Sequence, residues 1–172
     1  SALTFLSTDP EHLRLLQMNE RSVLTGRTAV VTGGESGIGR ATALRLATLG
    51  ATIFTGDLDI QVANDTCFQG LHIHRCRCDV RVEADVVALI SRAVQETGRL
   101  DILVNNAGVG LVKPITDVTE AEWDRCLDTN LKGAFFGCKH AIPHLRKNPA
   151  GGAIVNLASN AGLLPRAHDP VY

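Results

Sequence analysis

The sequence has almost no net charge and no long hydrophobic run. Lysine plus arginine number 17 and aspartate plus glutamate 18, which gives a formal net charge of −1 and no basic field for nucleic acid. No apolar stretch approaches the roughly 20 residues that span a bilayer, and the chain does not open with the charged and apolar segments of a signal peptide. We therefore expect a soluble, cytoplasmic protein that binds neither nucleic acid nor a membrane.

Cysteine is scarce, and its spacing excludes the common disulfide and metal motifs. The five cysteines are an odd number and no pair has CxxC spacing, so reduced, structural thiols are expected. One alternating run could suggest a metal site: His72, His74, Cys76 and Cys78. In a strand, however, residues two apart are separated by about 6.6 Å, so the outer two would lie roughly 20 Å apart, too far to share an ion. We predict no metal.

The length allows one domain with a short extension before it. A chain of 172 residues that is 45% hydrophobic can bury one sizeable core. We assign residues 24–172 to that domain and residues 1–23 to an N-terminal extension. Asp9, Pro10 and Glu11 would start a helix within the extension, and a docking helix and a loosely held arm are equal alternatives.

A glycine-rich stretch, TGGESGIG at residues 32–39, organises the rest of the domain. It follows an apolar, β-branched run at 28–31 and precedes a helix-forming run at 40–49, so it predicts a turn between a strand and a helix. Glycine lets backbone N–H groups approach an anion such as a pyrophosphate. A P-loop is excluded because Arg40 and Ala41 replace its lysine and its serine or threonine. A plain connecting turn is the alternative.

An acidic residue ends the next predicted strand, at 51–56. Asp57 lies 18 residues after Gly39, close to the place where a carboxylate accepts a hydrogen bond from a nucleotide ribose. The same carboxylate would repel the extra phosphate of NADP by roughly 4 kcal/mol at ~4 Å and an effective dielectric of about 20. Glu35 adds negative charge within the loop. The sequence therefore predicts NAD as the cofactor.

Strand and helix patterns alternate along the remaining chain. A polar strand at 72–78 is expected at a sheet edge, and Thr119 and Glu122 form the capping box of a long helix that Pro143 should bend. The other predicted elements are a weak helix at 60–67, a helix at 82–97, a strand at 101–104, the long helix at 120–146 and a strand at 153–157. Such alternation predicts an α/β, doubly wound parallel sheet of Rossmann type, with ligands beyond the carboxyl ends of its strands.

The long helix is expected to bury an unusual polar residue. Its apolar stripe includes Trp123, Cys126 and Ala141, and Asn130 falls in the same stripe. An unsatisfied amide there would cost roughly 1–3 kcal/mol. Asn130 therefore needs a hydrogen-bonding partner.

These motifs resemble those of the short-chain dehydrogenase/reductase family, from about residue 24 to residue 172. TGGESGIG is similar to the family's TGxxxGxG loop, residues 105–108 to its NNAG motif, and Tyr172 to the tyrosine of YxxxK. Ser159 precedes Tyr172 by 13 residues, as in the family. The resemblance implies a set of cofactor-binding residues: Gly33, Glu35, Ser36, Gly37, Ile38, Gly39, Asp57, Asp79, Val80, Asn106, Ala107 and Gly108.

The resemblance also implies an activity, which is hydride transfer between NAD(H) and a small-molecule secondary alcohol or ketone. Tyr172 would be the general acid and base, Ser159 would bind the reacting oxygen, and Asn130 would hold a water in a proton relay. A homodimer or homotetramer formed through the long helix is implied as well. The alternative is a non-catalytic NAD-binding protein with a regulatory or scaffold role.

The chain departs from the family pattern after Tyr172. The lysine of YxxxK, four residues further on, and the later strands of the sheet lie outside the 172 residues. We therefore expect an incomplete Rossmann-type sheet, and little or no turnover by this chain alone.

Overall fold

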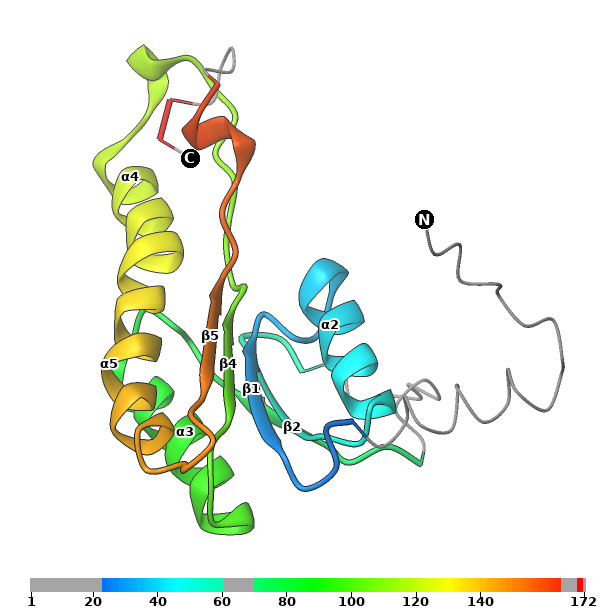
Figure 1. Ribbon diagram of the computed structural model, residues 1–172. Helices are drawn as coiled ribbons and strands as arrows, with labels where there is room; N and C mark the ends of the chain where they lie inside the picture. Colours follow the sequence, from blue (N-terminus) through cyan, green and yellow to red (C-terminus); the bar gives the residue numbers. More distant parts are fainter. Residues whose placement is uncertain (1–22, 61–69, 165–169, 172) are drawn as a thin grey trace, which may run out of the picture.

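One parallel sheet forms the centre of the molecule (Figure 1). The computed structural model describes residues 23–60, 70–164 and 170–171. The sheet has the strand order β3-β2-β1-β4-β5, and all its strand pairs are parallel. The elements are β1 (Thr28–Thr32), α2 (Gly37–Thr48), β2 (Thr52–Asp57), β3 (Ile73–Arg77), α3 (Glu83–Thr97), β4 (Ile102–Asn105), α4 (Glu120–Leu127), α5 (Gly133–Leu145) and β5 (Ala153–Asn156). The predicted doubly wound, Rossmann-type sheet is confirmed.

Helices cover both faces of the sheet. Helix α2 packs on one face through Ala43 and Ala47, whose small side chains meet the buried residues of β1 and β2. Helices α3 and α5 pack on the opposite face, as Figure 1 shows. All five residues of β1 are buried, as expected for a central strand that is covered on both sides.

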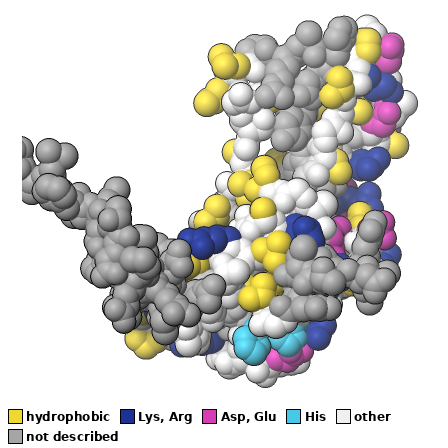
Figure 2. Space-filling model, turned by 90° about the vertical axis from the view of Figure 1, so that its right-hand side faces the viewer, with side chains coloured by type: hydrophobic (Ala, Val, Ile, Leu, Met, Phe, Trp, Pro, Cys, Tyr) yellow, Lys and Arg dark blue, Asp and Glu magenta, His cyan; other side chains and the backbone are white. Residues whose placement is uncertain are grey.

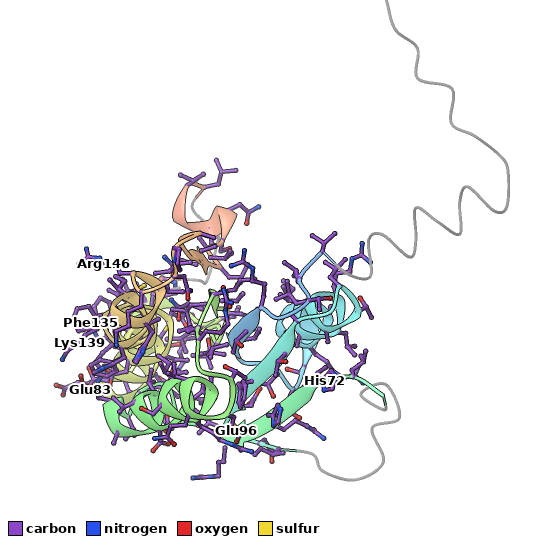
Figure 3. The ribbon with its side chains drawn as sticks, turned by 60° about the horizontal axis from the view of Figure 1, so that its bottom comes forward. His72, Glu83, Glu96, Phe135, Lys139 and Arg146 are labelled. Atoms are coloured by element: carbon purple, nitrogen blue, oxygen red, sulfur yellow. The ribbon has the colours of Figure 1, made fainter. Side chains whose placement is uncertain are left out.

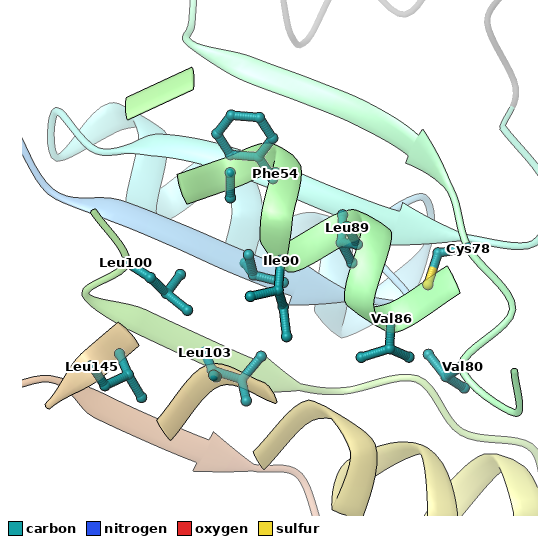
Figure 4. Close-up of a cluster of buried hydrophobic side chains, with 12 residues drawn as sticks. Phe54, Cys78, Val80, Val86, Leu89, Ile90, Leu100, Leu103 and Leu145 are labelled. Atoms are coloured by element: carbon teal, nitrogen blue, oxygen red, sulfur yellow. The ribbon is translucent and has the colours of Figure 1, made fainter. Parts of the chain in front are cut away.

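The larger core lies between the sheet and the helices α3 and α5 (Figure 4). Phe54 comes from β2, Ile90 from α3 and Leu103 from β4. Each of these residues is at most 1% exposed. Burying a side chain of this size contributes roughly 1.5–3 kcal/mol. This layer therefore supplies much of the energy that holds the strand ends in register.

The two edges of the sheet differ from its centre in burial. The polar strand β3 lies at one edge, as predicted, and none of its residues is fully buried. At the other edge, Val155 of β5 and Leu157 just beyond it are 47% and 42% exposed. They lie on the side of the sheet that carries α2. The space-filling view from that side shows hydrophobic side chains at the surface (Figure 2).

The predicted long helix is divided into three parts, which corrects one expectation about its buried face. The capping box of Thr119 and Glu122 is confirmed, but a π-helical turn, Asp128–Lys132, separates α4 from α5. The extra residue in such a turn rotates the later positions by about 100° relative to a regular helix. Trp123, which was expected in the buried stripe, is 48% exposed, but it precedes the π-helical turn, so the turn does not account for its exposure. Cys126 and Ala141 are buried as predicted.

The N-terminal helix and almost all of the weak helix after Ile60 lie outside the described residues. The four described cysteines are free thiols. None of the helices in the described part of the chain has the length and apolarity that a membrane span requires. Helix α5 continues past Pro143 to Leu145, and the bend predicted there stays a prediction.

A buried carboxylate ties the beginnings of two strands together. Asp101, which is 3% exposed, accepts hydrogen bonds from Arg27 Nη1 at 2.7 Å, Arg99 Nη2 at 2.6 Å and the Thr28 N–H at 2.9 Å. Burial alone would raise the pKa of Asp101, but the hydrogen bonds from Arg99, Arg27 and Thr28 hold it below the usual value. The stabilisation is therefore complete above the unfolded pKa of about 3.9 and is lost as the pH falls through the folded value.

Replacing Asp101 with alanine should lower the free energy of unfolding by about 3 kcal/mol at pH 7, because a buried, paired charge and the acceptor of a buried N–H are lost together. Lys132→Gln is the control. It removes the exposed Lys132–Asp128 pair and should cost less than about 1 kcal/mol. Urea denaturation followed by circular dichroism at pH 7 and pH 3 measures both. An Asp101→Ala loss no larger than the control, or one that persists unchanged at pH 3, would contradict this account.

Candidate cofactor and active site

The glycine loop after β1 exposes its backbone at the glycine positions. Gly33 (φ +66°) and Gly37 (φ +51°) adopt left-handed backbone conformations, which favour glycine. A Cβ at Gly33 would lie 2.8 Å from Asn106 Nδ2, and one at Gly39 would overlap the Gly33 carbonyl oxygen. Helix α2 begins at Gly37, three residues before the predicted start. The end of the loop is thus the first helical turn, whose free N–H groups and dipole attract an anion.

The NNAG segment after β4 is bonded directly to this loop. Asn106 Nδ2 donates to the carbonyl oxygens of Thr32 at 3.0 Å and Gly33 at 3.1 Å. The N–H groups of Asn106 and Ala107 donate to Thr32 Oγ1 at 3.0 and 3.1 Å. Sequence reasoning gave no role to Thr32, although its place at the head of TGxxxGxG was a signal. Its hydroxyl and carbonyl make the two loops one rigid unit.

The first asparagine of NNAG has a structural role. Asn105 is 6% exposed, and its Nδ2 donates to Asn156 Oδ1 on β5 at 2.7 Å. Its Oδ1 has no hydrogen-bond partner among the described residues and lies against Gly137 of α5, where an added Cβ would overlap it. Asn105 therefore joins the ends of β4 and β5 and sets the close approach of α5.

Asp57 lies at the carboxyl end of β2, as predicted. Its Oδ2 accepts a hydrogen bond from the Glu35 N–H at 3.1 Å, and its Oδ1 accepts one from the Asp59 N–H at 3.4 Å. These main-chain donors orient the carboxylate without neutralising it. The side chain keeps acceptor capacity for a ribose hydroxyl.

Asp79 and Val80, two of the predicted cofactor-binding residues, lie beyond the end of β3. The Asp79 carboxylate accepts hydrogen bonds from the Arg81 guanidinium, with Nη2 at 2.6 Å from Oδ2, and from the Arg81 N–H at 3.0 Å. The hydrogen bond from the Arg81 side chain is the main cause of a lowered Asp79 pKa. Val80 is 6% exposed, and an added Cβ at Gly133 would lie 2.9 Å from its Cγ2. Helix α5 thus fixes the position of this wall.

These groups surround one cleft of about 740 Å³ at the carboxyl edge of the sheet. Its volume falls within the range of about 300–1,000 Å³ that is usual for ligand sites. Of the predicted cofactor residues, all except Glu35 and Gly39 line it. Lining residues that the sequence reasoning missed include Arg81, Arg125 and Thr129. The glycine backbone of the loop can approach a diphosphate, and the oriented Asp57 carboxylate can accept from a ribose hydroxyl. Together these groups fit a dinucleotide.

The Asn130 side chain is hydrogen-bonded, as its predicted buried position requires. Its Oδ1 accepts from the Val109 N–H at 2.8 Å and its Nδ2 donates to the Val109 carbonyl oxygen at 2.9 Å. Asn130 lies in the π-helical turn, and such turns frequently occur at functional sites. The amide therefore fixes the loop that follows NNAG. Its role in a proton relay stays a prediction.

Of the two predicted catalytic hydroxyl groups, those of Ser159 and Tyr172, the structure describes only that of Ser159. Ser159 follows β5 and begins a short 3₁₀ turn, Asn160–Gly162, where its Oγ accepts from the Ala161 N–H at 3.1 Å. Ser159 is not among the residues that line the cleft. Tyr172 lies outside the described residues. The structure thus brings the cofactor residues together and places Ser159 after the neighbouring strand β5, whose pairing with β4 sets its position.

Metal ligation has no candidate in this region. Among the described residues, no group of three or more histidine, cysteine, aspartate or glutamate side chains could hold a metal ion. His74 instead stacks on Phe54, with ring centroids 4.4 Å apart, and pairs with Glu96.

Comparison with known proteins places the chain in a family. The family model described as short chain dehydrogenase matches residues 27–172. The chain is 35% identical to 3beta-hydroxysteroid dehydrogenase 2 of Eggerthella lenta, over 82% of this chain and 56% of that protein. It is 41% identical to D-threitol dehydrogenase of Mycolicibacterium smegmatis, over 80% and 54%. It thus spans about half the length of these relatives.

A solved structure agrees. It is a short chain dehydrogenase/reductase from Burkholderia phymatum in complex with NAD, 34% identical with a TM-score of 0.81, and the match covers 87% of this chain and 54% of that one. The sequence motifs, the parallel sheet and these matches lead to the same conclusion. The chain belongs to the short-chain dehydrogenase/reductase family.

Proposed function

We propose that the protein is an NAD(H)-dependent oxidoreductase that interconverts a secondary alcohol and a ketone. The observation that carries the proposal is the glycine loop with Gly33 and Gly37 beside the oriented Asp57 carboxylate, in a cleft of about 740 Å³. The NAD complex of the Burkholderia phymatum relative and the dehydrogenase names of the other relatives support it.

Each part of the cleft has a role in this proposal. The N–H groups at the start of α2 hold the diphosphate, Asp57 accepts from the adenosine ribose, and Asp79 and Val80 form the adenine wall. When bound, the nicotinamide supplies hydride transfer. Because Asp57 carries a negative charge that an extra phosphate would meet, NAD is preferred over NADP.

Proton transfer is assigned to the two hydroxyl groups. The Ser159 Oγ accepts from the Ala161 N–H, so its own O–H remains able to donate to the reacting oxygen of the substrate. Tyr172 gives a proton to that oxygen or takes one from it. Asn130 acts as a positioning residue, because both polar ends of its side chain hold Val109. A water in the proposed relay would then be held by main-chain groups of the π-helical turn.

The proposed assembly is a homodimer or homotetramer formed through the long helix. Leu131 and Phe135 are 67% and 58% exposed, and Trp123 is 48% exposed. Figure 3 shows Phe135 and Lys139 on the outer side of α5. These side chains belong to α4, the π-helical turn and α5, and a cluster of large exposed apolar side chains is typical of an interface. Light scattering of the purified protein measures its molecular mass and so tests the assembly. A cytoplasmic location is proposed from the free thiols of the described cysteines.

Cofactor titration combined with a panel of secondary alcohols tests the function. The full-length protein that contains this chain is titrated with NADH, followed by nicotinamide fluorescence, and is then incubated with NAD⁺ and each alcohol while NADH absorbance is recorded. Binding of NADH and alcohol-dependent NADH production are expected. Binding without turnover on any alcohol would favour the non-catalytic alternative, and the absence of NADH binding would refute the proposal.

A further inference from the structure

Glu35 belongs to the glycine loop, but its side chain does not line the cleft. The carboxylate is 5% exposed and forms an ion pair with Arg75 of β3, which is 16% exposed. Arg75 Nε donates to Glu35 Oε1 at 3.0 Å, and Arg75 Nη2 donates to Oε2. Thr55 Oγ1 of β2 also donates to Oε1, at 3.2 Å. A bidentate, largely buried pair of this kind is among the stronger polar contacts in proteins.

The same residue is connected to the ribose-selecting carboxylate. The Glu35 N–H donates to Asp57 Oδ2 at 3.1 Å. In the sheet register, Arg75 lies opposite Thr55, which is two residues before Asp57 on β2. Two residues along a strand span about 6.6 Å, so the Arg75 side chain starts within reach of the end of β2. Its guanidinium is the kind of group that binds a phosphate or a carboxylate.

A positive charge near the end of β2 would favour binding of the extra phosphate of NADP. The Glu35 carboxylate pairs with the Arg75 guanidinium. Without Glu35, the guanidinium would lose its bidentate carboxylate partner. A contact of Arg75 with Asp57, or with the 2′-phosphate of NADP, would then weaken discrimination against NADP. A second cation near the cleft, Arg81, is also committed to a carboxylate, that of Asp79. The Arg75 and Arg81 guanidinium groups thus each pair with a carboxylate other than Asp57, and Arg77, opposite Asp57 in the sheet register, is exposed.

We propose that Glu35 and Arg75 are a specificity-determining pair, in which Glu35 holds the Arg75 charge away from the ribose site and so strengthens the preference for NAD. The proposal rests on the proposed binding of NAD in the cleft. Glu35 is then a positioning residue rather than a cofactor contact. It acts on the cofactor through Arg75 and through Asp57.

Substitution of each partner separately should change cofactor preference in opposite directions. The quantity measured is the ratio of the Kd for NADPH to the Kd for NADH, from fluorescence titrations of the full-length protein. Glu35→Gln removes the carboxylate that holds the Arg75 guanidinium and should lower this ratio by about tenfold, the effect of one unit charge roughly 8 Å away in a partly wet site. Arg75→Gln leaves the Glu35 charge and should raise the ratio. The double variant should return it to within about twofold of the unchanged protein.

Thr55→Val is the matched control, because it removes the hydrogen bond to Glu35 and leaves both charges in place. It should leave the ratio unchanged. If both cofactors weaken equally in Glu35→Gln, or if the two single variants shift the ratio in the same direction, the pair is only structural and the proposal is wrong. Should Glu35→Gln fail to fold, Arg75→Gln and the double variant still give the predicted or the contrary result. Failure of the unchanged protein to bind NADH would refute the proposed function instead.

Discussion

Replacement of Tyr172 by phenylalanine is expected to lower kcat by about 10²–10⁴-fold, the usual contribution of a general acid or base. The Kd for NADH should change by less than about twofold, because the proposed diphosphate and ribose contacts come from the loops after β1 and β2. Tyr172 is the single tyrosine of the chain, so no neighbouring phenol of this chain can replace it. Steady-state kinetics with the best alcohol from the panel, together with NADH titration, measure both quantities.

Ser159→Ala and Gly162→Ala test whether the loss is specific to the chemistry. Ser159→Ala removes the proposed donor to the reacting oxygen and should also lower kcat without weakening NADH binding. Gly162 follows in the same loop, where an added Cβ meets nothing within 4 Å, so its alanine variant should retain full activity. If Tyr172→Phe keeps more than about a tenth of the kcat, the phenol is not the acid and base.

The fold could be predicted from sequence because its signals are local. The run at 28–31 is apolar and β-branched, and it became the buried central strand β1. The alternating, polar character of 72–78 indicated an edge strand, and β3 lies at an edge. Gly98 adopts a left-handed conformation at the end of α3, directly after the helix predicted at 82–97. Each of these depends on side chains within a few residues of one another.

The long helix shows where periodicity fails. Reading a stripe at 3.6 residues per turn assumes an uninterrupted α-helix, and the π-helical turn Asp128–Lys132 breaks that assumption. The stripe was right for Cys126 and Ala141 and wrong for Trp123, which precedes the turn, so its exposure does not result from the inserted residue. No side-chain pattern in the sequence marks the inserted residue. Asn130, within the turn, is hydrogen-bonded to the main chain of Val109.

Partners in the candidate site were harder to predict than the site residues themselves. Asn130 was expected to need a hydrogen bond, but its partner is the main chain of Val109, and main-chain groups have no sequence signature. Glu35 was expected to add negative charge to the loop, yet its carboxylate pairs with Arg75, 40 residues away. Such pairs depend on the sheet register, which a single sequence does not specify.

The last prediction concerns the glycine that closes the cradle. Gly39→Ala should lower the free energy of unfolding by about 3 kcal/mol, because the new methyl group would overlap the Gly33 carbonyl oxygen and Asn106 Nδ2 in a buried place where overpacking is costly. Those two groups cannot move apart easily, since Asn106 Nδ2 donates to the carbonyl oxygens of Thr32 and Gly33. The clash would displace the N–H groups that hold the diphosphate. NADH affinity should then fall by at least about 100-fold, which corresponds to two lost hydrogen bonds to a charged group.

Gly110→Ala is the control for this variant, because an added Cβ there has nothing within 4 Å and the backbone conformation is ordinary. Its stability and NADH affinity should match those of the unchanged protein. Thermal unfolding and NADH titration of both variants measure the two effects separately. If Gly39→Ala binds NADH within about threefold of the unchanged protein, the loop either relaxes around the methyl group or does not hold the diphosphate. In that case the cradle at the start of α2 would no longer support the proposed cofactor site.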